Sequence, residues 1–171
     1  ISKGLSFRNI MEDNLIIQSC QKGNTKEFGK LYDKFAKRIY DFIYFKTYHK
    51  ETAEDLAGKT FLKALEGIEK YNSKLGSFSS WLYSIARNTV IDHYRTNKNT
   101  IDIEDVWDLS SSSDLETDMD VRENLLKVKK HLAGLSPEHR DIVIMRVWQE
   151  MSYAEIGEAL GKSENSCKMM F

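Results

Sequence analysis

The feature that most constrains the fold is a series of helix-start and helix-stop signals in the C-terminal segment 135–171. Ser136 precedes Pro137, and this pair favours a helix start because the N–H that proline lacks has no helical partner at that position. Further on, Ser152 and Glu155 have the three-residue spacing of a capping box. These signals predict two helices, one beginning after Ser136 and one after Ser152.

The next signals end the second of these helices and start a third. Ile156, Ala159 and Leu160 form its apolar face. Gly161 can adopt the left-handed conformation that stops a helix, and Ser163 can cap a final one. Two helices separated by three residues are typical of a helix-turn-helix, whose second helix enters the DNA major groove. The segment therefore predicts DNA binding.

Composition predicts an all-α protein. The 171 residues are 41% hydrophobic with one proline, and no alternating runs bounded by turn residues suggest strands. Cys20 and Cys167 form no CxxC pair, which favours free thiols in a reducing, cytoplasmic environment over a disulfide. No stretch approaches the ~20 apolar residues of a membrane span, so we expect no membrane insertion.

The charges divide the chain into three segments. Residues 1–98 carry 17 Lys and Arg against 11 Asp and Glu, and residues 121–171 carry 8 against 7. Residues 99–120 carry eight acidic and no basic side chains and include a run of four serines, which is typical of a flexible linker. The linker is either a solvated tether or an anionic strand that imitates nucleic acid in a cationic groove.

Residues 1–98 have the pattern of several amphipathic helices. Asn24 with Glu27 and Thr52 with Asp55 are spaced as capping boxes, and Ser77 can cap a further helix. The apolar positions that follow at helical spacing are Phe28, Leu31, Tyr32, Phe35 and Ile39; Ala57, Phe61, Ala64, Leu65 and Ile68; and Phe78, Trp81, Leu82 and Ile85. We expect Trp81 to belong to this core rather than to a ligand site.

The helix after Ser77 has a second, mostly polar face. It consists of Ser84, Arg87, Asn88, Ile91 and Arg95, extended by His93 and Lys98. Arginine and asparagine can hold phosphates and base edges, so this face is either a nucleic-acid contact or an ordinary solvated surface.

Several segments together resemble a bacterial sigma factor of the extracytoplasmic-function group. Residues 78–95 read FSSWLYSIARNTVIDHYR and are similar to the signature of conserved region two in that family. Residues 53–56 (AEDL) and 60–64 (TFLKA) resemble its polymerase-binding helix. Residues 135–140 (LSPEHR) and 152–157 (SYAEIG) resemble conserved region four. The resemblance extends from about Met11 to the end of the chain.

The resemblance implies a dissociable subunit of RNA polymerase that needs no cofactor or metal and catalyses nothing itself. The expected partners are the β′ and β subunits of core RNA polymerase, promoter DNA and, as for many members of the group, an anti-sigma factor. The expected domains are region two at 11–98, the linker at 99–120 and a C-terminally truncated region four at 121–171.

The resemblance also assigns residues to three contacts. Those for polymerase are Glu54, Asp55, Leu56, Thr60 and Phe61. Those for the minus-ten element, where the strands separate, are Lys74, Ser77, Ser80, Ser84, Arg87, Asn88, His93, Arg95 and Lys98. Those for the minus-thirty-five element are Ser152, Lys162, Ser163, Asn165, Ser166 and Lys168.

Two positions depart from the family pattern. Gly58-Lys59 stands where the family usually has glutamine and an acid, which places a glycine inside a helix and reverses one charge. Met169-Met170 replaces a small residue followed by arginine, which removes a phosphate or guanine contact. We therefore expect altered polymerase binding and weaker minus-thirty-five recognition.

Other classes of function explain less of the chain. A stand-alone regulator that binds duplex DNA as a dimer accounts for the helix-turn-helix but leaves residues 52–95 without a role. An enzyme is disfavoured because the four histidines have no metal-ligand spacing and no phosphate-binding glycine loop occurs. A sigma-like adaptor held by a partner protein would share the same fold.

Overall fold

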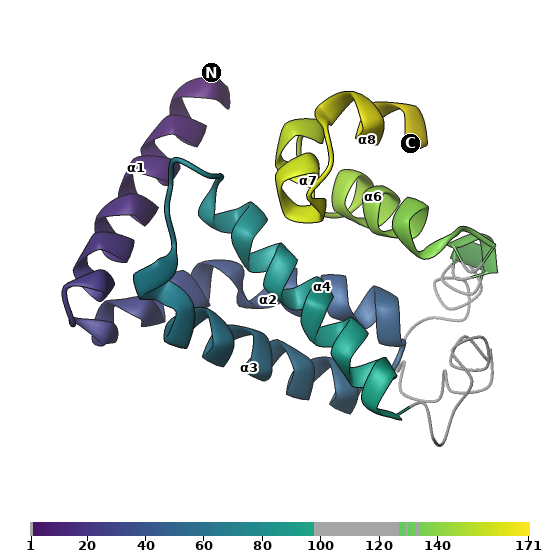
Figure 1. The fold of residues 1–171 in the computed structure, drawn as a ribbon, viewed down its shortest axis with the longest axis horizontal. Coiled ribbons are helices and arrows are strands. Elements are labelled where there is room, and N and C mark those ends of the chain that lie inside the picture. The colour runs from purple at the N-terminus through teal and green to yellow at the C-terminus, as the bar shows by residue number, and fades with distance from the viewer. Residues whose placement is uncertain (1, 98–126, 129, 133) are drawn as a thin grey trace.

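The structure is a computed structural model that describes residues 2–97, 127–128, 130–132 and 134–171. The predicted linker, 99–120, and Lys98 lie outside the described residues. Over the described ranges the chain is helical and contains no strand, as the sequence predicts (Figure 1). No helix in these ranges is both long and apolar enough to cross a membrane.

The N-terminal half is a bundle of four long helices. They are α1 (Ser2–Gln21), α2 (Phe28–Thr47), α3 (Lys50–Gly67) and α4 (Phe78–Asn97), with the short 3-10 turns η1 (Thr25–Glu27) and η2 (Ile68–Lys70) between them. Helix α2 packs against α3 and α4, and α1 packs against α2 (Figure 1). Because α1 begins at Ser2, the expected domain start at residue 11 falls inside a helix.

Apolar spacing explains why α2 lies at the centre of this bundle. Its buried side chains Leu31, Phe35, Ile39 and Phe42 recur every three or four residues and so share one face. They pack with buried residues of the neighbouring helices, including Leu82 of α4. The predicted core is correct at most positions, but Tyr32 is exposed, with its ring in a T-shaped contact with Phe61 at a centroid distance of 4.8 Å.

Two predicted capping boxes in this half are wrong. Asn24 makes no capping hydrogen bond, and its side-chain amide donates to Ser19 Oγ instead. Helix α3 begins at Lys50, one turn earlier than the sequence suggested, because the ring of His49 accepts a hydrogen bond from the backbone N–H of Thr52. The third start signal is confirmed, since the N–H of Ser80 donates to Ser77 Oγ at 3.1 Å.

The C-terminal half contains three short helices, α6 (Pro137–Val147), α7 (Tyr153–Leu160) and α8 (Glu164–Met170). Their predicted caps are all present: Ser136, Ser152 and Ser163 each accept a backbone N–H three residues on. The turn between α7 and α8 is tight. A Cβ on Gly157 would lie 2.6 Å from the carbonyl oxygen of Lys162, closer than atoms can approach. Only glycine fits there.

The two halves are in contact. Helix α6 lies against α2, and α7 lies against α4 (Figure 1). Cys20 is buried in the N-terminal half and Cys167 in the C-terminal half, and both are free thiols.

Candidate nucleic-acid interface

Helix α3 separates the predicted polymerase-binding residues into two groups. Glu54 and Asp55 are exposed, whereas Leu56, Thr60 and Phe61 are buried in the bundle. Leu56, Thr60 and Phe61 therefore contribute to the core of the bundle, whereas Glu54 and Asp55 are accessible on its surface. A resemblance identifies positions on a helix but does not say which of them face the core.

The exposed face of α3 carries both apolar and charged side chains. Leu62 is 56% exposed and adds an apolar side chain to this face. Lys59, at the position where the charge departs from the family pattern, pairs with Asp55 at 2.6 Å. Both partners of this pair are more than half exposed, so it contributes little to stability. The pair does, however, offset the negative charge of Asp55.

A cavity of about 160 Å³ lies at the start of α4. Its lining from the N-terminal half is Lys70, Tyr71, Asn72, Leu75, Gly76, Ser77, Ser80, Trp81 and Ser84. Trp81 is half-buried, with its ring centroid 5.2 Å from that of Tyr71. It therefore belongs both to the aromatic core, as predicted, and to the cavity wall. Leu75, on the loop before α4, is 83% exposed.

Three of the predicted minus-ten residues line the cavity, and a fourth, Lys74, lies on the loop beside it. Ser77 and Ser84 are half-buried on its wall, and Ser80 is buried and hydrogen-bonded to Ser77 Oγ at 2.8 Å. Lys74 is exposed on the adjoining loop, where its backbone N–H donates to the side chain of Asn72. The lining of the cavity is therefore both polar, from its serines and Lys70, and aromatic, from Tyr71 and Trp81.

The remaining predicted residues continue along α4. Asn88 and Arg95 are exposed, and Arg95 lies 3.5 Å from Asp92. His93 is half-buried, and its pKa is lowered by burial first and by the nearby Lys59 second. The polar face predicted for this helix is therefore present from the cavity to the last turn.

Arg87 differs from the other residues of this face. Its Nε donates to Oδ2 of Asp141 at 2.9 Å, and the other carboxylate oxygen of Asp141 accepts from Lys46 of α2. Asp141 belongs to α6 and is 1% exposed. Burial lowers the pKa of Lys46, and the Asp141 carboxylate opposes that effect. One buried acid thus joins two basic side chains of the other half.

In the helix-turn-helix, most predicted contacts already hold the local structure. The N–H of Ser152 donates to Glu155 Oε2 at 2.9 Å, and the N–H of Glu155 donates to Ser152 Oγ at 3.2 Å. Ser163 caps α8 through the N–H of Ser166 at 3.1 Å. Lys162 lies 3.2 Å from Glu138. These side chains cap α7 and α8 and join the turn between them to α6.

Helix α8 itself presents a short polar and apolar surface. Asn165 and Lys168 are exposed, and Lys168 pairs with Glu164 at 2.6 Å. Ser166 is half-buried. Met169, one of the two methionines that depart from the family pattern, is 84% exposed. The helix therefore exposes three polar side chains, Glu164, Asn165 and Lys168, and one apolar side chain, Met169.

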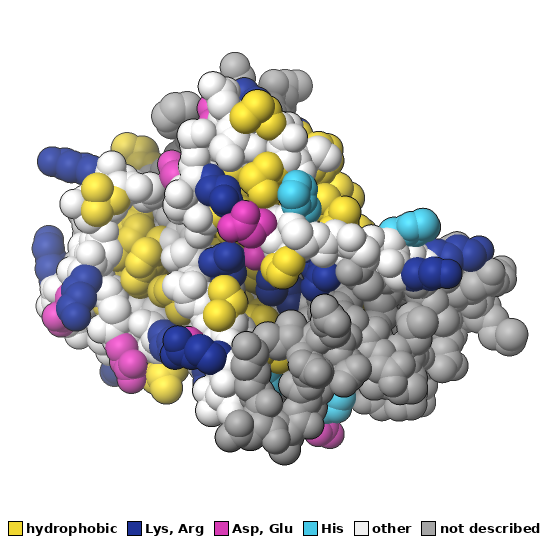
Figure 2. All heavy atoms as spheres, turned by 45° about the vertical axis from the view of Figure 1, so that its right-hand side comes forward, with side chains coloured by type: hydrophobic (Ala, Val, Ile, Leu, Met, Phe, Trp, Pro, Cys, Tyr) yellow, Lys and Arg dark blue, Asp and Glu magenta, His cyan; other side chains and the backbone are white. Residues whose placement is uncertain are grey.

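Surface charge is mixed on the face drawn in Figure 2, where basic and acidic side chains are interspersed with hydrophobic atoms between them. A surface of this kind does not attract nucleic acid through a broad field of one sign. Binding would depend on particular side chains of α4 and α8.

Sequence reasoning missed the residues that join the two halves, among them Lys46, Asp141, Gln149 and Glu158. One signal for Asp141 was present. It precedes Ile144 and Met145 by three and four residues, which places an acid on the apolar face of its helix. A buried acid needs a basic partner, but nothing in the sequence identifies which one.

Comparisons with known proteins agree with the two-part organisation. Residues 31–100 match the family described as Sigma-70 region 2, and residues 125–170 match the one described as Sigma-70, region 4.

Two curated relatives match over most of the chain. The ECF RNA polymerase sigma factor BldN of Streptomyces coelicolor is 30% identical over 161 residues, which cover 91% of this chain and 60% of BldN. The RNA polymerase sigma factor YlaC of Bacillus subtilis is 34% identical over 141 residues, which cover 78% of this chain and 79% of YlaC. The chain thus spans less than two thirds of the length of BldN.

Among solved structures, CnrH in complex with the cytosolic domain of CnrY has a similar fold. The TM-score is 0.71 at 19% sequence identity, and the match covers 93% of this chain and 89% of that one.

Proposed function

This chain belongs to the sigma-70 family of RNA polymerase sigma factors, in its extracytoplasmic-function group, and we propose that it directs core RNA polymerase to specific promoters. The N-terminal half, residues 11–98, acts as region two and the C-terminal half, 121–171, as region four, with 99–120 as the connecting linker. The protein supplies specificity and leaves RNA synthesis to the polymerase.

The observation that carries the proposal is the polar cavity at the start of α4, followed along the same helix by Asn88 and Arg95. Strand separation at a minus-ten element releases bases that a protein must hold, and each flipped base costs a few kcal/mol. Stacking on an aromatic side chain returns about 1–3 kcal/mol per base. Trp81 and the serines that line the cavity provide an aromatic surface and hydroxyl groups for one such base.

Core polymerase docks on the exposed face of α3 in this proposal. Glu54 and Asp55 provide charge, and Leu62 provides an apolar contact that the sequence-based assignment did not include. The Asp55–Lys59 pair reduces the negative charge available for this contact. The helix-turn-helix reads duplex DNA upstream, with Asn165 and Lys168 as its base and phosphate contacts.

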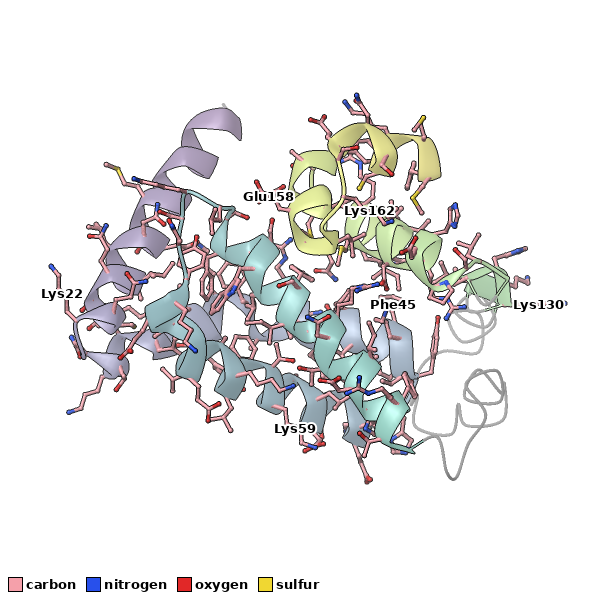
Figure 3. All side chains as sticks on the ribbon, viewed as in Figure 1. Lys22, Phe45, Lys59, Lys130, Glu158 and Lys162 are labelled. Atoms are coloured by element: carbon pink, nitrogen blue, oxygen red, sulfur yellow. The ribbon has the colours of Figure 1, made fainter. Side chains whose placement is uncertain are left out.

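The test is transcription with purified bacterial core RNA polymerase on a promoter library, with start sites mapped and melting followed by permanganate reactivity. Asn88→Ala and Arg95→Ala should each lower open-complex formation about ten-fold, since one good base contact is worth about 1–3 kcal/mol. Binding of core should not change. Lys22→Ala is the matched control, because Lys22 is an exposed cation at the far end of α1 (Figure 3).

Two results would overturn the proposal. One is normal melting by the Asn88→Ala, Arg95→Ala double variant. The other is tight, dimeric binding to duplex DNA without polymerase, together with no initiation by any bacterial core enzyme. That outcome would assign the chain to stand-alone helix-turn-helix regulators.

A further inference from the structure

The contact between the two halves contains both apolar and polar pairs. Phe45 of α2 and Trp148, at the end of α6, have ring centroids 4.8 Å apart (Figure 3). The hydroxyl of Tyr83, itself fully buried in α4, donates to the side-chain oxygen of Gln149 at 2.7 Å. Arg38 donates to the backbone carbonyl of Gln149. The two halves are therefore joined by an aromatic contact and by hydrogen bonds of buried or half-buried groups.

Asp141 is the buried acidic side chain of this contact. Its side chain is 2% exposed, and a carboxylate removed from water to that degree needs charged partners. Both partners, Lys46 and Arg87, come from the N-terminal half, so the acid is satisfied only when the halves are together. Arg87 also belongs to the face of α4 that we assign to promoter DNA.

A second carboxylate reaches the other end of that face. Glu158 projects from α7 toward the start of α4 (Figure 3), and its Oε2 accepts a hydrogen bond from the backbone N–H of Ser77 at 3.0 Å. The same oxygen lies 3.1 Å from where a Cβ on Gly76 would be. Glu158 is the one lining residue of the cavity that comes from the C-terminal half.

We propose that this contact is a closed, autoinhibited state, in which Asp141 and Glu158 of region four occupy the anion-binding positions that promoter DNA takes on region two. A carboxylate and a phosphate both present paired oxygens to a guanidinium or a backbone N–H, so each can replace the other at Arg87 and Ser77. The inference rests on the proposed function, because it assumes that α4 is the DNA-binding face.

The closed state has a simple consequence for binding. Only open molecules can hold DNA on α4, so the apparent affinity is the intrinsic affinity multiplied by the open fraction. A partner that binds either half only in the open arrangement raises that fraction. Core polymerase, docked on the opposite α3 surface, can act in this way if it holds the two halves apart.

The first test removes the two carboxylates from the full chain. In the Asp141→Asn, Glu158→Gln double variant, the radius of gyration measured by X-ray scattering should increase. Affinity for a fluorescein-labelled, random-sequence, single-stranded 20-mer should rise about ten-fold or more. The control is the Glu66→Gln, Glu138→Gln double variant, which removes the same total charge. Glu66 is exposed on α3, and Glu138 pairs with Lys162 inside the C-terminal half, so neither residue joins the two halves. This control should leave the radius of gyration unchanged and should alter the affinity for the 20-mer only by the effect of two fewer negative charges.

The second test holds the molecule closed without altering a proposed DNA contact. Cysteines introduced by Phe45→Cys and Trp148→Cys, joined by a short bismaleimide, should abolish binding of the same 20-mer. The unlinked variant should retain it. The native thiols, Cys20 and Cys167, are buried and should react slowly.

The outcomes are separable. An unchanged radius of gyration in the double variant would refute the claim that the two carboxylates hold the halves together. An increased radius without a gain in DNA affinity beyond the control would refute the claim that the closed state blocks DNA binding. Full DNA binding by the cross-linked molecule also refutes it. None of these readouts uses polymerase, so a chain that opens as expected yet fails to start transcription would contradict the proposed function and leave the closed state intact.

Discussion

Two of the helical glycines, Gly58 and Gly157, should respond in opposite ways to the same substitution. Both lie within helices, where replacing glycine by alanine ordinarily gains about 0.5–1 kcal/mol because the unfolded chain loses less freedom on folding. A Cβ on Gly58 would meet no atom within 4 Å. We therefore expect Gly58→Ala to increase the free energy of unfolding of the N-terminal half by about 0.5–1 kcal/mol.

Gly157→Ala meets a different environment. Its Cβ would lie 2.6 Å from the carbonyl oxygen of Lys162 and 3.4 Å from the backbone nitrogen of Glu164. The Lys162 peptide cannot move away easily, because its own N–H donates to the carbonyl of Gly157 at 2.8 Å. Forced shifts of this kind cost about 1–3 kcal/mol, which exceeds the gain in helix propensity. We expect a net loss of about 1–2 kcal/mol.

Urea denaturation followed by far-ultraviolet circular dichroism gives the two free energies, and hydrogen exchange assigns each to its half. Amides of residues 153–170 should exchange faster in Gly157→Ala, and those of residues 50–67 slower in Gly58→Ala. If Gly157→Ala proves as stable as the parent, the close approach in the turn does not restrict the backbone, and the argument from the 2.6 Å distance fails.

Three further predictions concern single groups. Ser152→Ala should lower the free energy of unfolding by about 1 kcal/mol in urea titrations, because the helix loses its N-terminal cap; an unchanged midpoint would contradict this. Burial raises the pKa of Tyr94 to about 12, whereas an unfolded tyrosine ionises near 10, so stability should fall as pH rises from about 10 to 12. Tyr94→Phe should reduce the slope of that pH dependence, which equal slopes in the variant and the parent would disprove. Cys20 and Cys167 are buried, and burial raises the pKa of both thiols, so neither should react with a thiol reagent at neutral pH until urea unfolds the chain; prompt labelling would show that the core opens.

The helix-turn-helix was the part of the fold that sequence could predict residue by residue. Each of its signals acts over three or four positions, as when Ser152 and Glu155 exchange hydrogen bonds. The backbone geometry that satisfies such a pair is the start of a helix and nothing else. Gly161, with a φ of 66°, confirms the predicted left-handed stop for the same local reason.

Where several local options compete, the sequence alone was insufficient. Thr52 and Asp55 have correct capping-box spacing, but His49 lies one turn earlier and its ring accepts the N–H of Thr52. Histidine is an uncommon cap, so propensity favoured the wrong residue. The family resemblance placed Leu56 and Phe61 among the polymerase contacts, and both are buried in the N-terminal bundle, as the helical spacing of Phe61 had indicated.

The candidate site was predictable in its residues but not in their partners. An amphipathic pattern identifies Arg87 as a cation on the polar face of α4, and its guanidinium can hold either a phosphate or a carboxylate in the same geometry. Which anion it meets is decided by Asp141, 54 positions further along the chain. That pairing depends on how two separate halves pack, and no periodicity in either half encodes it.

Because a carboxylate and a DNA phosphate compete for Arg87, salt should shift the balance between the closed and the DNA-bound arrangement. Arg87 and Lys46 bind Asp141 where water is largely excluded, so added salt weakens this contact much less than it weakens contacts between exposed cations and DNA. Raising ionic strength should therefore favour the closed arrangement over the DNA-bound one. A radius of gyration that stays constant with salt in the free protein, while affinity for single-stranded DNA falls steeply, is the expected pattern. An increase of the radius of gyration with salt would mean that exposed charges hold the two halves together. It would contradict the inference that the buried ion pairs of Asp141 do so.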